Sequence, residues 1–150
     1  MCKSLGVLKL ENCVFCQIVN RERPASIVYR DEKVLAFMDF RPVNPGHVLV
    51  IPKVHAAGLS GLDEETGAHM FKVGMRIVAG VKRAGVKCEG VNLLLSDGEA
   101  AFQEIFHIHL HVIPRFKDDN LRIGFGRQYR LNPERKELDE IALKIRDALR

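Results

Sequence analysis

The sequence predicts an α+β domain in which helices pack on an antiparallel sheet of about five strands. Short runs rich in β-favouring residues, each bounded by turn residues, predict the strands. A long stretch with apolar residues every three or four positions predicts one central helix, and a shorter stretch of this kind predicts a C-terminal helix. The length of 150 residues suits one domain, and the sequence contains no internal repeat and no linker-like segment.

The most informative of these strands is predicted at residues 107–114. Histidine and aliphatic residues alternate here with a period of two, which is typical of an extended strand. The imidazoles of His107, His109 and His111 should therefore share one face. The other face is expected to be buried and carries Ile108, Leu110 and Val112, and Pro114 is expected to close the strand.

Three imidazoles on one face predict phosphoryl or nucleotidyl transfer. A neutral imidazole is a nucleophile near pH 7, and a neighbouring imidazole can donate a proton or stabilise negative charge. His109 alone has an imidazole on each side, so it is the expected nucleophile, with His111 or His107 in support. The alternative, a catalytic metal centre made of all three rings, is disfavoured because same-face residues lie roughly 6.6 Å apart along a strand.

Cys13 and Cys16 form a C-x-x-C pair near the N-terminus. In a reducing compartment such a pair is more typical of metal binding or redox chemistry than of a structural disulfide. A thioredoxin-type role would need a following βαβ pattern, which is not evident. Tetrahedral zinc would need two further ligands, and two buried thiols without a metal are the alternative.

The first half of the chain predicts a short helix at residues 15–20 and a hairpin of two strands at 26–29 and 34–39, joined through 31–33. The Asn44-Pro45-Gly46 sequence predicts a turn, because Gly tolerates the positive φ that a type II turn requires. A buried strand follows at 48–51. Asp39, which ends the second strand, either binds two vicinal hydroxyls or forms a turn ahead of Pro42.

The second half of the chain predicts a long helix at residues 62–83, with Ser60 as N-cap, Asp63 completing a capping box and Gly85 ending the helix. A central strand is predicted at 91–95, followed by a loop at 96–104 whose backbone amides could bind a phosphate. Asn132 and Pro133 are the predicted start of the final helix. Its apolar face comprises Leu138, Ile141, Ala142, Ile145 and Leu149.

Composition narrows the class of protein. Apolar residues make up 47% and charged residues 28% of the chain, as in ordinary globular proteins. No apolar run is long enough to span a membrane and the N-terminus lacks a signal-peptide core, so a cytoplasmic protein is expected. The net charge of +4 arises within residues 115–136, where seven Lys and Arg face three Asp and Glu. This segment is either a solvated loop or one that attracts a phosphate-bearing ligand or an acidic partner, and no nucleic-acid-binding motif appears.

The pattern His-φ-His-φ-His-φ-φ at residues 107–113 resembles the signature of the histidine triad family. The resemblance extends upstream through Gln103, residues 47–55 and Asp39, and covers roughly residues 13–114. It implies a tail at 1–12, a core at 13–114, and a basic loop and helix at 115–150 that belong to the same domain. It also implies a homodimer whose two sheets join into one.

The activity that the resemblance implies is that of the bacterial phosphoramidases of this family. Such a hydrolase would cleave a purine nucleoside phosphoramidate, such as an AMP conjugate, at the α-phosphorus through a nucleotidyl-histidine intermediate. The alternatives are a dinucleoside polyphosphate hydrolase and a nucleotide-binding adaptor without significant turnover. Rates on the two substrate types separate the enzymes, and covalent trapping of a nucleotide separates both from an adaptor.

The resemblance also assigns candidate site residues. It implies His109 as nucleophile with His111 and His47 in support, although His47 alone could equally be structural. Nucleotide contacts are implied for Asp39, which would bind the ribose, and for Phe40, Ser96, Gln103 and His111. Structural zinc, with no organic cofactor, is implied at Cys13, Cys16, His55 and His107. Two departures bear on the leaving group: Ser96 stands where the phosphoramidases usually have Asn, and Glu104 where they usually have Ser.

Overall fold

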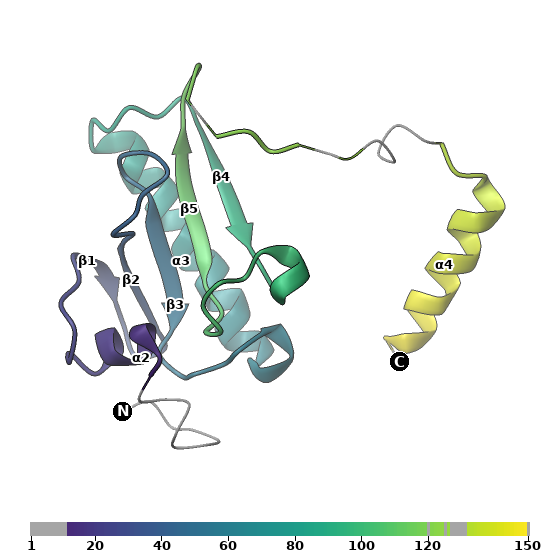
Figure 1. Cartoon of the computed structure of the whole chain (residues 1–150), viewed down its shortest axis with the longest axis horizontal. Coiled ribbons are helices and arrows are strands. Elements are labelled where there is room, and N and C mark those ends of the chain that lie inside the picture. Colours follow the sequence, from purple (N-terminus) through teal and green to yellow (C-terminus); the bar gives the residue numbers. More distant parts are fainter. Residues whose placement is uncertain (1–11, 120, 125, 127–131, 150) are drawn as a thin grey trace. The chain divides into compact units, whose positions relative to one another are not determined.

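The structure, a computed structural model, describes residues 12–119, 121–124, 126 and 132–149. Its described residues form an α+β fold with five strands and three α-helices, which confirms the predicted class (Figure 1). Most predicted elements start or end within two residues of the observed ones. The elements are α2 (Val14–Val19), β1 (Ile27–Arg30), β2 (Val34–Met38), β3 (Val48–Pro52), α3 (Glu64–Arg83), β4 (Gly90–Leu95), β5 (Leu110–Arg115) and α4 (Arg135–Ala148).

The five strands form one sheet in the order β1-β2-β3-β5-β4, and every neighbouring pair is antiparallel. Strand β5, which contains His111, therefore lies between β3 and β4. Residues 91–95 were predicted to form a central strand, and within the described sheet this is wrong because β4 lies at an edge. An apolar run does not reveal whether a strand has a neighbour on one side or on both.

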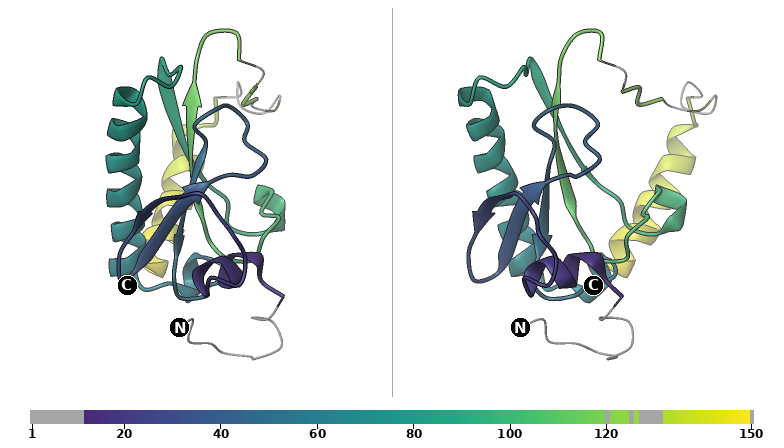
Figure 2. Two further views of the ribbon diagram at one scale, coloured as in Figure 1. Left: turned by 90° about the vertical axis from the view of Figure 1, so that its left-hand side faces the viewer. Right: turned by 60° about the vertical axis from the view of Figure 1, so that its left-hand side comes forward.

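Helix α3 lies along one face of the sheet, and the short helix α2 lies on the other side near one end of the sheet, as Figure 2 shows. On β2, Val34 and Ala36 point towards α3 and pack with Val73, whereas Leu35 and Phe37 belong to the apolar cluster around α2. Successive side chains of a strand point to opposite faces, so this uninterrupted apolar strand contributes to two cores. The face covered by α2 also contains the cysteines and, as described below, the histidines.

Helix α3 begins later than predicted. Its N-cap is Asp63, whose carboxylate accepts a hydrogen bond from Thr66 N at 2.8 Å, so Ser60 is not the cap. Ser60 lies instead within a single 3-10 turn, Leu59–Gly61. Asp is as good an N-cap as Ser, and the side chain nearest the first helical turn takes that role. The end of the helix at Arg83 is as predicted, and Gly85 follows with φ of +72°.

Strand β5 is shorter than predicted, because its ladder begins at Leu110 rather than at His107. The preceding residues form other hydrogen bonds: Ile108 N donates to Ala56 O, and His107 N donates to Ile105 O. Pro114 does not close the strand, which ends at Arg115. The alternation of imidazole and aliphatic residues therefore continues across a segment that is extended only in part.

The chain divides into two compact units, Met1–Asp119 and Asn120–Arg150. In the second unit, α4 has Glu134 as N-cap, without a side-chain capping bond, so the predicted capping by Asn132 is wrong. The apolar side chains of α4 are exposed within the described part of the chain. The predicted tail lies outside the described residues except for Asn12, as does part of the basic segment. No described helix combines the length and apolar character that crossing a bilayer requires.

Candidate active site and metal-binding site

His109 has one ring nitrogen fixed as a donor. Its Nδ1 lies 2.8 Å from the carbonyl oxygen of His107, and a carbonyl can only accept, so Nδ1 carries the proton. In the neutral ring the other nitrogen, Nε2, then keeps a lone pair. Burial lowers the pKa of His109, although the His107 carbonyl and Asp39 oppose this shift. His109 is therefore neutral near pH 7, with a nucleophilic Nε2.

His111 and His47 form a second set of hydrogen bonds. Val43 N donates to Nδ1 of His47 at 3.2 Å, which makes that nitrogen an acceptor and places the proton on Nε2. Nε2 of His47 lies 2.9 Å from Nδ1 of His111 and donates to it. The remaining N–H of neutral His111 is therefore on its Nε2. Burial, then the neighbouring His109 and His47, lower the pKa of His111 to about 4.

Asp39 lies on the same side of His47 as Val43. Its Oδ2 is 3.4 Å from Nδ1 of His47, and its Oδ1 accepts a hydrogen bond from Arg41 N at 2.8 Å. The carboxylate therefore does form the turn that the sequence allowed. Asp39, His47 and His111 could in principle hold a metal ion, but two zinc-bound nitrogens lie about 3.3 Å apart. The shorter 2.9 Å contact between the rings is that of a hydrogen bond.

Two of the triad rings, those of His107 and His109, pack on Phe15 of α2. The centroid of Phe15 lies 5.7 Å from that of His107 and 5.2 Å from that of His109, and both contacts are edge-on. The centroids of His109 and His111 are 4.7 Å apart, so the rings lean together more closely than the strand spacing implied. Phe15 lies inside the C-x-x-C pair, but nothing in its sequence position indicated contact with residues ninety positions away.

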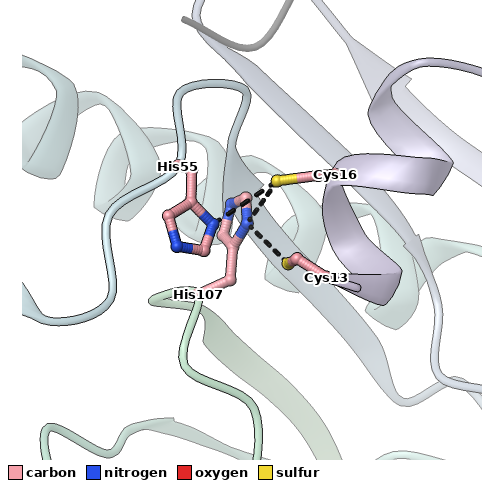
Figure 3. A group of neighbouring side chains, drawn as sticks. All are labelled: Cys13, Cys16, His55 and His107. Carbon is pink, nitrogen blue, oxygen red and sulfur yellow. Dashed lines mark hydrogen bonds between the residues drawn. The ribbon is translucent and has the colours of Figure 1, made fainter. Parts of the chain in front are cut away.

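A second group of four side chains converges beside the triad. Cys13 and Cys16 project from the start of α2 towards His55 and His107, as Figure 3 shows. Nδ1 of His107 lies 3.5 Å from Sγ of Cys13 and 3.6 Å from Sγ of Cys16, and Nδ1 of His55 lies 3.4 Å from Sγ of Cys16. A tetrahedral zinc ion would separate such sulfur and nitrogen ligands by about 3.5 Å. The four residues therefore fit a closed zinc site.

The ring orientation of His107 supports the same fit. Its Nε2 lies 2.8 Å from the carbonyl oxygen of Pro52 and so carries the proton, which leaves a lone pair on Nδ1 facing both sulfurs. A backbone carbonyl is one of the partners that commonly fix the tautomer of a metal-binding histidine. His107 is fully buried, and burial lowers its pKa to about 4, although the bond to Pro52 opposes the shift. It therefore remains neutral, as a ligand must.

A cavity of about 530 Å³ adjoins Asp39 and Phe40. Its wall combines apolar side chains with Asp39, and such a mixture of many apolar groups and few polar ones is typical of small-molecule sites. Phe40 is largely exposed at its rim. The lining residues are Ile18, Pro24, Ala25, Met38, Arg23 and Ser26, together with these two.

A model of the HIT domain, the domain of the histidine triad, matches residues 20–118, which is more than half of the chain. The chain belongs to the HIT family. A HIT family protein of Bacillus anthracis has a crystal structure similar to this one, with a TM-score of 0.84 and 38% identity over 94% of this chain and 99% of that chain.

Two further relatives bear on the chemistry. The crystal structure of a zinc-bound histidine triad family protein from Mycobacterium smegmatis has a TM-score of 0.71 and 41% identity, and the match covers 93% of this chain and 99% of that chain. Adenylylsulfatase HINT3 of Arabidopsis thaliana is 40% identical over 113 residues, which are 73% of this chain and 55% of that protein. The chain is thus similar to a zinc-bound histidine triad family protein and, over part of its length, to an adenylylsulfatase.

Two residues named from the HIT resemblance have structural partners. The amide of Gln103 donates to Ala57 O at 2.7 Å and to Ile105 O at 3.1 Å, and its oxygen accepts from Gly98 N at 2.7 Å. Gln103 thus ties together the loop before the triad, and its contact with a nucleotide stays a prediction. The Glu104 side chain is 83% exposed and lies 3.9 Å from the Arg41 guanidinium, so it does not point into the triad. Ser96 is half-buried in the loop after β4.

Proposed function

We propose that this HIT protein hydrolyses a purine nucleoside phosphoramidate or a similar nucleotidyl compound through a nucleotide bound covalently to His109. The observation that carries the proposal is the bond from Nδ1 of His109 to the His107 carbonyl. It leaves the lone pair of Nε2 free without any separate base, and it holds the ring at a fixed angle. A nucleophile that is neutral and oriented before substrate binds needs no further activation.

The reaction then has two steps. The lone pair on Nε2 of His109 forms a bond to the α-phosphorus while the bond from phosphorus to the leaving nitrogen breaks. This nitrogen keeps the electron pair and takes up a proton from solvent, which the second step returns. Water next attacks the phosphorus, the bond to His109 breaks, and a nucleoside monophosphate and a proton are released. Throughout, the Nε2–H of His111 donates a hydrogen bond to a non-bridging phosphoryl oxygen, where charge develops.

The remaining substrate contacts follow from the cavity beside Asp39. The free lone pairs of the Asp39 carboxylate bind the two ribose hydroxyls, and Phe40 covers the base at the rim. Ser96 and Gln103 lie on the loop between β4 and the triad. In this proposal they border the part of the site that receives the phosphate and the leaving group. Because Glu104 is turned towards Arg41, it acts on the leaving group only at long range.

We further propose structural zinc at Cys13, Cys16, His55 and His107. The support is the three sulfur–nitrogen distances of 3.4 to 3.6 Å, the gathering of all four ligand atoms within 4.8 Å of one another, and the lone pair of His107 that faces the thiols. Four protein ligands leave no coordination position for water or substrate, so the ion would supply folding stability. It would hold α2, and with it Phe15, against the triad.

A homodimer in which two sheets join is also proposed. The support is the position of β4 at an edge of the described sheet, with Leu94 on it 46% exposed. An exposed edge strand with apolar side chains favours pairing with another strand. Sedimentation of the native protein and of a Leu94→Lys variant tests this, and a native monomer would contradict it. The cytoplasmic location stays a prediction.

Replacement of His109 by Ala tests the catalytic proposal. We expect His109→Ala to abolish turnover of adenosine 5′-phosphoramidate and to prevent trapping of labelled nucleotide on the protein after rapid alkaline quench, because a P–N bond to histidine survives alkali but not acid. Lys72→Ala, on the exposed side of α3, is the control and should retain both. Persistent turnover in His109→Ala would refute the nucleophile. Faster hydrolysis of a dinucleoside polyphosphate would mean that the leaving group is a nucleotide and not an amine. If native protein traps no labelled nucleotide, the result would favour a nucleotide-binding adaptor.

A further inference from the structure

Asn44 is a buried polar residue in the loop that carries His47. Only 6% of its surface is exposed, and both donors of its side-chain amide are used. One donates to the carbonyl oxygen of Pro114 at 2.9 Å and the other to Oδ2 of Asp119 at 2.9 Å. Both partners are acceptors, so the orientation of the amide is determined. The Asn44 side chain therefore fastens the loop between β2 and β3 to the end of β5.

Asp119 is itself held firmly. Its carboxylate accepts two hydrogen bonds from the Arg115 guanidinium, which also donates to Oδ1 of Asn92 on β4. Its side chain is 2% exposed, and the bonds from Arg115 hold the pKa of Asp119 well below its usual range. A bidentate pair between Arg and a carboxylate is both strong and directional. Asp119 is thus a rigid anchor for Asn44.

The position of the Asn44 loop decides which way the His47 ring is protonated. Nδ1 of His47 has two competing neighbours, the Val43 amide at 3.2 Å and the Asp39 carboxylate at 3.4 Å. The amide can only donate to Nδ1, whereas the carboxylate can only accept from it. Val43 precedes Asn44 in the chain, and Asn44 O accepts from His47 N at 3.1 Å. Because Val43 and Asn44 are adjacent, a displacement of Asn44 would also displace the Val43 amide.

The outcome of this competition reaches the reacting atoms. With Val43 as donor, His47 is protonated on Nε2 and donates to Nδ1 of His111, so His111 presents an N–H on its far side. If Asp39 captured Nδ1–H of His47 instead, Nε2 of His47 would become an acceptor. Nδ1 of His111 would then have to carry the proton, and its Nε2 would present a lone pair to a negatively charged phosphoryl group.

We propose that Asn44 and Asp119 are positioning residues that hold the Val43 amide against His47 and thereby fix the tautomers of His47 and His111. This inference rests on the proposed function for its kinetic consequence, but the tautomers themselves can be observed without turnover. Neither residue touches the reacting atoms. Their effect passes through the backbone N–H of Val43. Almost any residue at position 43 would supply this group, so the sequence does not reveal its role.

The direct test is nitrogen NMR of the imidazoles in 15N-labelled protein, where protonated and lone-pair nitrogens are well separated. We expect native protein to show His47 and His111 protonated on Nε2. We expect Asn44→Ala, and Asp119→Asn more weakly, to shift both rings towards the Nδ1–H tautomer. Asn92→Ala is the matched control, because it removes a partner of Arg115 and leaves the bond between Asn44 and Asp119 intact. A folded Asn44→Ala protein with native tautomers would overturn the proposal.

Kinetics provide the second readout. In Asn44→Ala we expect kcat on adenosine 5′-phosphoramidate to fall about 10- to 100-fold, the range for losing a group that orients a functional histidine, with little change in KM. In Asn92→Ala we expect native kcat despite a similar loss of thermal stability, and equal losses of kcat would overturn the proposal. If Asn44→Ala does not fold, Asp119→Asn decides by the same comparison. If native protein proves inactive, the proposed function fails while the NMR result still decides this inference.

Discussion

His47 and His111 are joined ring to ring, with Nε2 of His47 2.9 Å from Nδ1 of His111. The two residues are 64 positions apart in the sequence and meet because β3 pairs with β5, where Leu49 lies opposite His111. Both rings are mostly buried and burial lowers the pKa of each, so the contact is a hydrogen bond between neutral rings. The His47 side chain therefore supports the triad from outside the triad motif.

Removal of His47 should slow the reaction without preventing substrate binding. His47→Ala leaves Nδ1 of His111 without its partner, so His111 can adopt either tautomer. We expect kcat on adenosine 5′-phosphoramidate to fall about 10- to 100-fold. His69→Ala, which removes a histidine on α3 whose partner is Asp31, should leave kcat unchanged. An unaltered kcat in His47→Ala would show that His111 needs no orienting partner.

The metal site predicts the effects of removing zinc. We expect purified protein to contain one zinc ion per chain and Cys16→Ser to lose most of it, because a hydroxyl is a poor zinc ligand. Removal of the ion with a chelator should lower the unfolding temperature. Cys88→Ser is the control, since Cys88 lies outside the four-residue cluster and contacts Gly90 O. Metal analysis and thermal unfolding measure both effects, and equal zinc content in the two variants would contradict the assignment.

The Asp31 carboxylate should make part of the free energy of unfolding depend on pH. Partial burial raises the pKa of Asp31. Hydrogen bonds from His69, from the Val34 and Lys33 amides and from Tyr29 lower it by more, so the pKa lies well below its usual value of 3.8. A folded-state pKa below the unfolded one stabilises the fold above about pH 4, and this stabilisation is lost as pH falls through the folded-state value.

We therefore expect Asp31→Asn to be clearly less stable than native protein at pH 6, with the difference narrowing steadily below about pH 4. Urea unfolding at a series of pH values measures this. Glu65→Gln is the control, because the Lys33–Glu65 pair is exposed and contributes little. A stability difference that did not change with pH would show that the Asp31 charge is not what matters.

Two glycines of α3 make a matched pair. A Cβ at Gly74 would lie 2.9 Å from Cδ2 of buried Leu110, whereas a Cβ at Gly80 would meet nothing within 4 Å. Ala is favoured over Gly in a helix, so Gly80→Ala should stabilise the fold by about 0.5 to 1 kcal/mol. Gly74→Ala should destabilise it by about 1 to 3 kcal/mol, because the core must shift. Chemical unfolding of both variants measures the difference. Equal effects would mean that the Leu110 side chain can move aside without a cost in stability.

The sequence alone determined the fold class and the extent of most elements, and it singled out the triad histidines and the cysteine pair as candidate site residues. Apolar residues that recur with a period of two or of 3.6 indicate strands or helices from the local sequence alone, so these patterns can be recognised without knowledge of the fold. The spacing of His107, His109 and His111 indicated the chemistry, and the resemblance to the histidine triad family added the residues that should accompany them. Local patterns failed where a choice depended on distant partners, as for the cap of α3 and the edge position of β4.

Only the tertiary structure decided how the histidines are protonated. Each ring has two nitrogens, and which one carries the proton depends on the group opposite: the His107 carbonyl for His109, the Pro52 carbonyl for His107, and the Val43 amide for His47. All three partners are backbone groups, and because the backbone is common to all residues, no sequence pattern marks them. The triad motif names the rings, but the folded backbone determines which nitrogens can attack, donate or bind metal.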